Sequence, residues 1–373
     1  MNTFIERILG QKAGSVAVIK PDYIVINDGI SNAAVDEIST VGNQEKVWVF
    51  HDHDVPTGSP EAAAILKKNL EFALKHGCHY VQAQGVGYQY MLNDIVKQGD
   101  IIIGGGTHGS IFGAKEALGI NVSIPELARI VETGRYSVIV PETISVTVTG
   151  ELKDAVNMMD AAMDFLTKGF EVKDKVIEFY CPSLDNHQKS VLCSMACMTG
   201  AYTAVVVNEQ AEKSVVFDLS NVESMVMLPC VSRLEQEKAK ICKKSEVEGV
   251  ELHAGQIGGY TGGTIEDLRK AAELIKGKTL AHGFRLSICP ATSKDYLQAI
   301  KEGIIIQFID YGAQIQAPGD RSVVIQGAGA MGHNEKLLTT GLYTFAGAMG
   351  CDDAEIYSAP VDSVIKASYT KRI

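Results

Sequence analysis

Short runs rich in β-branched residues alternate with helical patterns along the whole chain, and this alternation constrains the fold more than any other feature. Strands that alternate with helices usually form mostly parallel sheets with helices packed on their faces. The sequence therefore predicts an α/β protein. The chain has 373 residues, and because a domain usually has ~100 to 200 residues, two or three such units are expected.

The first third of the chain contains the clearest local signals. A helix is predicted at residues 59–77, where Ser59 can act as the N-cap, Pro60 occupies the first helical position and Gly77 ends the helix. The following residues suggest strands at 79–84 and 100–105 and helical patterns at 88–96, 110–119 and 124–134. These segments together indicate one α/β layer.

Two changes of composition suggest domain boundaries. Residues 137–152 alternate Val, Ile and Thr with a period of two, as in a half-buried strand, and a charged stretch at 233–249 is interpreted as an exposed helix and linker. The last third repeats the βα pattern, with strands expected at 250–259, 284–291 and 304–312 and helices at 264–277 and 293–303. We therefore expect α/β domains at residues 1–136, 137–235 and 236–373.

The charge balance favours a small-molecule partner. With 34 basic and 45 acidic residues the formal charge is −11, which gives no electrostatic reason to bind nucleic acid or an anionic membrane.

The first residues lack a signal-peptide pattern, and no apolar run approaches the ~20 residues that span a bilayer. The cysteines lie mostly in apolar segments without a CxxC, and the close pair Cys193 and Cys197 is more typical of a core than of a metal site. A cytoplasmic protein is expected.

The first candidate motif is FHDHDVPTG, in which His51, Asp52, His53 and Asp54 follow a strand. Open α/β sheets place ligand sites at the carboxyl ends of their strands. Because alternate residues share one face, His51 and His53 could hold a cation together, or Asp52 could orient an imidazole for proton transfer. The alternative is a polar loop ahead of a helix.

The second motif is a strand followed by a glycine-rich turn, from Gly104 to Gly109, that contains Thr107 and His108. It satisfies G-x-G-x-x-G, and amides at a helix start can bind an anion. Three successive glycines satisfy that pattern easily, however, and the acid expected ~20 residues further on at a strand end is missing. A dinucleotide site is therefore not favoured, and for His108, in a turn whose glycines leave its ring approachable, we favour a site role over a structural one.

The remaining motifs are the turn GQIGGYTGG and the segment QAPGDRSVV. Tyr260 and Thr261 lie where an anion would meet the amides of the following helix, although a tight connection that needs glycine explains the turn equally well. Asp320 and Arg321 follow the second turn, and such an adjacent pair is often a surface feature.

In this order, the segments resemble the large subunit of 3-isopropylmalate dehydratase and homoaconitase, in the aconitase superfamily. FHDHDVPTG is similar to that family's DHNVPT, the GGGTHG loop to its GDSHT loop, and TGGTIEDLRKAAELIKGK to its TNGRIEDLRAAAEVLKGR. The resemblance covers nearly the whole chain. It implies three α/β/α domains with mostly parallel sheets, and a swivelling fourth domain supplied by a separate small subunit.

The resemblance also implies that the catalytic centre has changed. The family holds a 4Fe-4S cluster with three cysteines, and the matching positions here are Tyr260, Asp320 and Val323. Tyrosine and valine cannot replace the thiolates that such a cluster needs. We expect no 4Fe-4S cluster and no other cofactor, with a divalent metal at the HDHD segment as a variant.

Other family residues are replaced as well. Aligned on the same motifs, the acid of GDSHT becomes a glycine, the histidine of G-I-x-H-Q becomes Tyr88, the polar pair on a middle helix becomes Ser194 and Thr199, and both carboxylate-binding arginines are lost, to Tyr343 and Ala348. The residues retained at matching places are Asp52, His53, His108 and Gln89, with Thr107 in place of a serine.

These residues favour a lyase without the family's iron. Dehydration of a hydroxy acid requires proton removal beside a carboxylate and assistance to the departing hydroxide, which the iron supplies as a Lewis acid. We expect a cluster-free hydro-lyase or isomerase of a small carboxylic acid, in which His108 and the Asp52–His53 pair exchange protons and Tyr88 or Tyr260 donates to the leaving oxygen. Substrate contacts are expected from Thr107, Gln89, Tyr260, Thr261, Asp320 and Arg321, with Arg285 as another possible carboxylate partner.

A different class of function stays open at this point. Loss of the cluster cysteines and of both arginines favours a non-catalytic relative that binds a metabolite or a partner subunit, whereas retention of His108 and of the HDHD segment favours an enzyme. A nucleotide binder that uses the triple glycine is a third interpretation.

Overall fold

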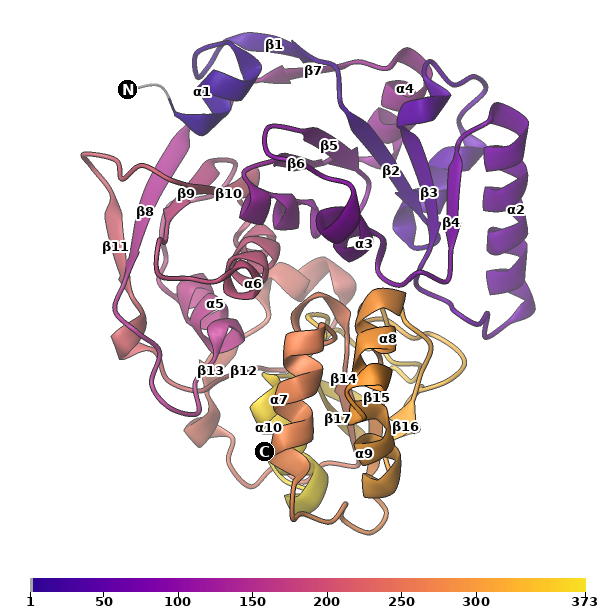
Figure 1. The fold of residues 1–373 in the computed structure, drawn as a ribbon, viewed down its shortest axis with the longest axis vertical. Helices are drawn as coiled ribbons and strands as arrows, with labels where there is room; N and C mark the ends of the chain where they lie inside the picture. Colours follow the sequence, from indigo (N-terminus) through magenta and orange to yellow (C-terminus); the bar gives the residue numbers. More distant parts are fainter. Residues whose placement is uncertain (1–2) are drawn as a thin grey trace.

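Three main sheets organise the chain in the computed structural model, which describes residues 3–373 (Figure 1). The strands of the first two sheets pair in parallel throughout, and the third sheet is parallel except at one edge. No helix of the described residues combines the length and the apolar composition that crossing a membrane requires. The α/β class expected from the sequence is confirmed.

The first sheet has five strands in the order β4-β3-β2-β5-β6. Its strands are β2 (Tyr23–Asn27), β3 (Val47–His51), β4 (His79–Gln82), β5 (Ile101–Gly104) and β6 (Leu118–Asn121). Its α-helices are α1 (Phe4–Leu9), α2 (Pro60–His76), α3 (Gly87–Asp94) and α4 (Ile124–Thr133), and the 3-10 helices are η1 (Ile30–Asp36), η2 (Gln44–Lys46) and η3 (Gly109–Lys115). A separate two-stranded ribbon joins β1 (Val16–Ile19) to β7 (Tyr136–Ile139).

Local capping chemistry explains why the prediction for α2 is confirmed. The Ser59 hydroxyl accepts a hydrogen bond from the Ala62 amide at 3.1 Å, and Gly77 takes the left-handed conformation at φ 72° that ends the helix. The helix predicted at 110–119 is confirmed in its first part as the 3-10 helix η3, but its last two residues belong to strand β6.

The second sheet has four strands in the order β10-β9-β8-β11. They are β8 (Thr143–Thr149), β9 (Val176–Tyr180), β10 (Thr203–Val207) and β11 (Val215–Asp218), with helices α5 (Met158–Thr167) and α6 (Asn186–Ala196) and the 3-10 helices η4 (Cys197–Thr199) and η5 (Leu219–Asn221). Its buried core includes Met163, Phe165, Phe179 and Leu192.

The third sheet has seven strands in the order β13-β12-β18-β17-β14-β15-β16. They are β12 (Met225–Met227), β13 (Ile241–Lys243), β14 (Ala254–Ile257), β15 (Arg285–Ile288), β16 (Gln314–Ile315), β17 (Lys336–Thr339) and β18 (Glu355–Ser358). Its helices are α7 (Ile265–Ile275), α8 (Ser293–Lys301), α9 (Ile304–Tyr311) and α10 (Val361–Thr370), with 3-10 helices η6 (Arg233–Lys238), η7 (Lys244–Glu246) and η8 (Gly259–Thr261).

The segment 304–312 contains helix α9 (Ile304–Tyr311) and its C-cap Gly312, so the strand expected there is wrong. Ile304, Ile305 and Phe308 are buried, whereas Ile306 and Ile309 are exposed, which is the spacing of one helix face. The helix expected within 233–249 is also wrong in part, because this stretch contains a short 3-10 helix and then β13, which pairs antiparallel with β12.

The expected domain boundaries stay a prediction. Two strands pair with strands of the neighbouring segment. Strand β7, after the boundary at 136, pairs with β1, and strand β12, before the boundary at 235, joins the third sheet.

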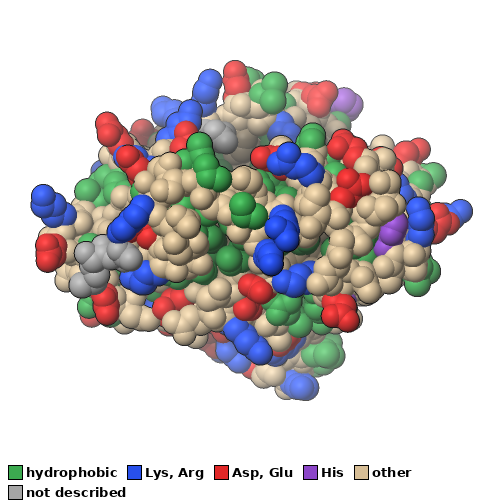
Figure 2. Space-filling view, turned by 90° about the horizontal axis from the view of Figure 1, so that it is seen from above, with side chains coloured by type: hydrophobic (Ala, Val, Ile, Leu, Met, Phe, Trp, Pro, Cys, Tyr) green, Lys and Arg blue, Asp and Glu red, His purple; other side chains and the backbone are tan. Residues whose placement is uncertain are grey.

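On the face shown in Figure 2, acidic and basic side chains are interspersed.

Candidate active site

A cavity of about 350 Å³ lies among loops from the first and third sheets. The loops that follow β2, β3, β5, β14 and β17 all contribute to its lining, so it lies at the carboxyl ends of parallel strands, where α/β proteins place their ligands. Its polar lining includes Asn27, Asp28, Asn32, His53, Asp54, Thr107, His108, Arg233, Tyr260, Asp320 and Tyr343, and its apolar lining includes Ile30, Ile65, Val323, Val324, Ile325 and Phe345.

Asp28, at the carboxyl end of β2, organises the HDHD segment. Its carboxylate accepts hydrogen bonds from the backbone amides of Asp52, His53 and Asp54 at 3.0, 3.0 and 3.1 Å, and His51 Nδ1 lies 3.0 Å from it. Burial raises the pKa of Asp28, but the hydrogen bonds from His51 and His53 outweigh burial and hold this pKa well below its usual range. Asp28 is therefore a fixed negative charge.

His53 lies between two carboxylates and faces the cavity. Its Nδ1 is 2.7 Å from Asp52 Oδ1 and 3.1 Å from Asp28 Oδ1, while Nε2 is 3.8 Å from Asp320 Oδ2 on the opposite wall. Burial lowers the pKa of His53, but the charge of Asp52 and the hydrogen bonds to both carboxylates raise it well above its ordinary value. The ring therefore carries a proton at neutral pH.

Asp52 itself lies beneath the histidine. Its Oδ2 accepts a hydrogen bond from the Gly87 amide at 2.6 Å, and the side chain is almost fully buried. Burial raises the pKa of Asp52 in spite of the neighbouring His53. Asp52 is thus placed to orient the imidazole and not to touch a ligand.

His108 lies in the glycine-rich turn after β5, and its ring packs against that of Tyr260. The two ring centroids are 4.2 Å apart, and Nδ1 lies 3.5 Å from the Ser194 carbonyl and 3.4 Å from its hydroxyl. Burial lowers the pKa of His108, so the imidazole is neutral at pH 7. The same cavity therefore holds one protonated and one neutral histidine.

The glycines of this turn make room for a tyrosine and not for a phosphate. A Cβ atom at Gly104 would overlap the hydroxyl of Tyr88, and the Gly109 amide already donates to Asn121 Oδ1 at 3.1 Å. The anion-binding interpretation of the turn is therefore not supported by its geometry, because its amide is occupied and its small residues accommodate a side chain.

The predicted site residues divide into two groups. His53, Thr107, His108, Tyr260 and Asp320 are brought together around the cavity. The remaining predicted residues contact the protein instead of lining the cavity: Tyr88 packs edge to face on Phe112, Gln89 donates to the Tyr260 carbonyl, Thr261 donates to the Thr340 carbonyl, and Arg321 donates to the carbonyls of His53 and Ala328. Arg285, the other suggested carboxylate partner, forms an ion pair with Glu335.

Asp28 and Arg233 are among the lining residues that the sequence did not single out, and Tyr343 was noted there only as the replacement of an arginine. Asp28 follows strand β2 in the segment NDGI, and a carboxylate at the carboxyl end of a strand next to β3 was a signal for it. Tyr343 hydrogen-bonds Thr107 through its hydroxyl, and Arg233 supplies a cation from the charged stretch. Arg233 comes from a segment with no motif, whereas Tyr343 stands where the resemblance places a carboxylate-binding arginine, which was a signal for the site.

The HDHD segment offers donors for a metal, but they are engaged already. Asp28, Asp52 and His53 bring donor atoms within 4.8 Å of one another. However, the Asp28 carboxylate accepts the three backbone amides, and Asp52 Oδ2 accepts the Gly87 amide. These bonds are typical of a carboxylate pair that holds a histidine, and the structure gives no further support for a cation here.

The donors around the cavity do not fit an iron-sulfur cluster. None of its lining residues is a cysteine in the described part of the chain. One thiol beside the cavity is that of Cys197, whose Sγ lies 3.9 Å from His108 Nδ1 and donates to the Ser194 carbonyl at 3.0 Å. Cluster ligation needs several converging thiolates, and tyrosine, aspartate and valine line the wall at the positions in question.

Comparison with known proteins identifies the family of this chain. A model of the aconitase family (aconitate hydratase) matches residues 5–216 and 215–361. The chain belongs to the aconitase family. Its fold is shared with Thermococcus kodakaraensis aconitase X (holo-form), with a TM-score of 0.62 and 14% sequence identity over 98% of this chain and 96% of that one.

Relatives in this aconitase family match the chain over nearly its whole length. The 3-isopropylmalate dehydratase large subunit of Pyrococcus horikoshii is 28% identical, covering 98% of this chain and 97% of that protein. The homoaconitase large subunit of Thermus thermophilus is 26% identical, covering 96% and 93%. The family predicted from the sequence is confirmed, and with it the enzyme class, a lyase.

Proposed function

We propose that this aconitase-family protein is a cluster-free hydro-lyase or isomerase that acts on a small carboxylic acid. One observation carries the proposal: His53 and His108 face the same cavity, and their surroundings shift their pKa values in opposite directions, upward for His53 and downward for His108. Two groups whose environments push their pKa values apart are what a paired acid and base require.

The proposal assigns the two proton transfers as follows. His108 takes the proton from the carbon next to the substrate carboxylate, and a carbon-carbon double bond forms as the carbon-oxygen bond of the hydroxyl breaks. His53 gives its proton to the departing hydroxide, which leaves as water. In the reverse direction the same groups hydrate the double bond.

Two further side chains support this assignment. Burial, as the largest cause, raises the pKa of Tyr260 well above its ordinary value, so its hydroxyl stays protonated and is able to donate a hydrogen bond. Tyr260 therefore takes the donor role in the proposal in preference to Tyr88, which does not line the cavity. Asp28 and Asp52 hold the His53 ring in place.

The lining also suggests the kind of acid. Arg233 is the one arginine or lysine among the lining residues of the described chain, and a guanidinium is a good partner for a carboxylate. The side chains of Ile30, Ile65, Val323 and Ile325 form an apolar wall. We expect a substrate with one carboxylate at Arg233 and an aliphatic group against this wall.

A small partner subunit belongs to the same proposal. The relatives are named large subunits, and the chain matches 97% of the Pyrococcus horikoshii protein. We expect a second chain to cover the cavity and to exclude water from it during the reaction. Purification with the product of a neighbouring gene would test this.

Solvent exchange tests the proposed chemistry across a set of candidate acids. The protein, with any co-purifying subunit, is incubated in deuterium oxide with small hydroxy acids and the corresponding unsaturated acids, and deuterium at the α-carbon is followed by NMR. We expect incorporation for at least one acid, and its loss in His108→Ala. The exposed His282 provides a matched control, because His282→Ala should retain the exchange.

Two results would contradict the proposal. Exchange retained in His108→Ala would remove this residue from proton abstraction. Saturable binding of an acid with no exchange at any pH would instead favour a protein that binds a metabolite without transforming it.

A further inference from the structure

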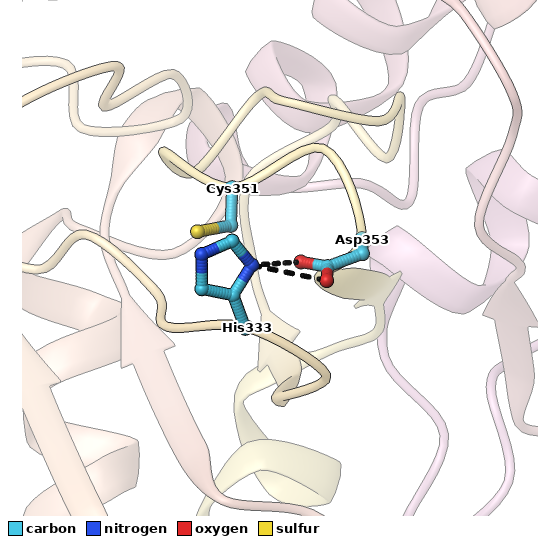
Figure 3. Close-up of side chains that lie close together, drawn as sticks. All are labelled: His333, Cys351 and Asp353. Carbon is cyan, nitrogen blue, oxygen red and sulfur yellow. Dashed lines mark hydrogen bonds and ion pairs between the residues drawn. The ribbon is translucent and has the colours of Figure 1, made fainter.

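Two loops at the amino ends of β17 and β18, which are neighbouring strands inside the third sheet, bring an imidazole, a thiol and a carboxylate together outside the cavity. His333 lies in the loop before β17, and Cys351 and Asp353 lie in the loop before β18 (Figure 3). One donor atom from each of the three side chains lies within 4.8 Å of the other two. None of these residues takes part in the proposed reaction.

The spacing of the donor atoms is close to that of ligands on one metal ion. His333 Nδ1 lies 3.2 and 3.1 Å from the two carboxylate oxygens of Asp353. Zinc-nitrogen and zinc-oxygen bonds of about 2.0 to 2.2 Å at tetrahedral angles place the two donors about 3.3 Å apart. An ion would replace the hydrogen bond between the imidazole and the carboxylate, so the side chains of His333, Asp353 and Cys351 would each turn by on the order of 1 Å to share it.

The backbone fixes the two loops relative to each other. The Met331 amide donates to the Met349 carbonyl at 2.6 Å, and the Glu355 amide donates to the Glu335 carbonyl at 2.9 Å. These bonds lie on either side of the three side chains, so the loops are joined before any ion binds. Asn334 takes a left-handed φ of 57°, which turns the chain directly after His333.

The donor set and its exposure define the ion. We propose that His333, Cys351 and Asp353 bind a divalent cation of the zinc class, since thiolate, imidazole and carboxylate together suit Zn²⁺ or Co²⁺ and not Mg²⁺ or Ca²⁺. The His333 side chain is 82% exposed and that of Asp353 46% exposed, so water completes the coordination. Three protein ligands and one water make an open, exchangeable site.

The site differs from the acidic group beneath the cavity. Asp28, Asp52 and His53 also converge, but they are nearly all buried, include no sulfur and accept backbone amides. Among the groups of three donors in the described part of the chain, the one at His333 is the one that contains a cysteine. A thiolate signal therefore distinguishes the two groups.

Metal binding at this position would brace the apolar wall of the cavity. The loop that ends at His333 also carries Val323, Val324 and Ile325, and the Val324 amide donates to the Ala348 carbonyl at 2.7 Å. An ion held by His333 and Cys351 would add a further connection to the hydrogen bonds that already join these two loops. Metal binding should therefore slow the opening of this wall.

Cobalt titration of the chelator-treated, reduced protein tests the proposal. Wild type should bind one Co²⁺ per chain with a thiolate-to-cobalt charge-transfer band, and Zn²⁺ should displace it. Cys351→Ala should lose the band. His333→Ala and Asp353→Asn should weaken binding by more than the roughly 10- to 100-fold that loss of a second-shell partner costs.

Matched controls keep the result specific. Cys78→Ala and His282→Ala change a half-buried cysteine and an exposed histidine elsewhere, and both should bind like wild type. Amide exchange across residues 323–331 should slow on zinc addition in wild type and not in Cys351→Ala. Absence of the thiolate band in wild type, or its persistence in Cys351→Ala, would overturn the proposal.

Discussion

Tyr260 covers one face of His108, with 4.2 Å between the ring centroids and 31° between the ring planes. By resemblance, this tyrosine occupies the position of a cluster cysteine in the aconitase family. At the position where the family binds iron through a cysteine sulfur, this chain has Tyr260, whose ring covers His108. This contact therefore couples the loss of the cluster ligand to the acid-base properties of the cavity.

Removal of the Tyr260 ring should raise the pKa of His108. Burial lowers that pKa, because the charged imidazolium is poorly solvated. In Tyr260→Ala the ring is exposed to water and the pKa should rise toward its ordinary value, whereas Tyr260→Phe keeps the aromatic cover and should change it less. NMR titration of the histidine ring protons measures both. Equal pKa values in wild type and in Tyr260→Ala would contradict the assigned cause.

Asp28→Asn should lower the pKa of His53. The Asp28 carboxylate lies 3.1 Å from the ring nitrogen and, with Asp52, stabilises the imidazolium. An amide at this position keeps the shape but removes the charge. The same NMR titration measures the change, and Asp36→Asn, which removes a carboxylate that pairs with Lys68 away from the cavity, serves as the control. An unchanged pKa of His53 in Asp28→Asn would show that Asp28 does not stabilise the imidazolium.

The free energy of unfolding should fall with rising pH because one ion pair between the second and third sheets is lost. His187, at the start of α6, lies 3.3 Å from Asp267, at the start of α7. Burial lowers the pKa of His187, but the Asp267 charge outweighs it and raises the pKa to about 9. Because this pKa is raised on folding, the stabilisation is complete below about pH 6.5 and is lost as the pH rises through about 9.

Urea unfolding of wild type and His187→Gln at pH 6 and pH 9.5 tests this pH dependence. The difference in unfolding free energy should be on the order of 3 kcal/mol at most at pH 6 and near zero at pH 9.5. Because all other groups titrate in both proteins, the difference isolates His187. An equal difference at both pH values would refute the ion pair as its source.

Gly113→Ala should destabilise the contact between the first two sheets. A Cβ atom at Gly113 would lie 2.7 Å from Val205 Cα and would overlap the Ala204 carbonyl. These are backbone atoms that cannot rotate away, so we expect a loss of about 3 kcal/mol, the upper part of the usual range for overpacking. Gly169→Ala, with φ 65° and no neighbour within 4 Å, should cost about 1 kcal/mol from backbone strain alone. Thermal unfolding compares the two.

The sequence predicted those elements whose ends are set locally. Helix α2 has its own cap residues and was placed correctly from them. Helix α9 was mistaken for a strand because residues 304–309 are almost all apolar, so no periodicity shows which side chains are buried. The buried face, with Ile304, Ile305 and Phe308, is determined by packing in the third sheet, which a local pattern does not contain.

The site was predictable as far as its motifs extend. His53 and His108 were identified because each follows a strand in a distinctive turn, and parallel strands bring such turns together. Arg233 is brought to the cavity by tertiary packing of a segment that carries no motif, and Tyr343 lies there at a position that the resemblance had marked only as a lost arginine. Tyr88 was placed in the site by resemblance and Arg321 by its position after a turn, and the side chains of both contact the protein instead of lining the cavity.

Iron and acid-labile sulfide analysis, with a visible spectrum of protein purified without oxygen, tests the central claim most directly. We expect a colourless protein with neither iron nor sulfide in stoichiometric amount, because Tyr260, Asp320 and Val323 stand at the cluster positions. A brown protein with about four irons and four sulfides per chain would contradict it.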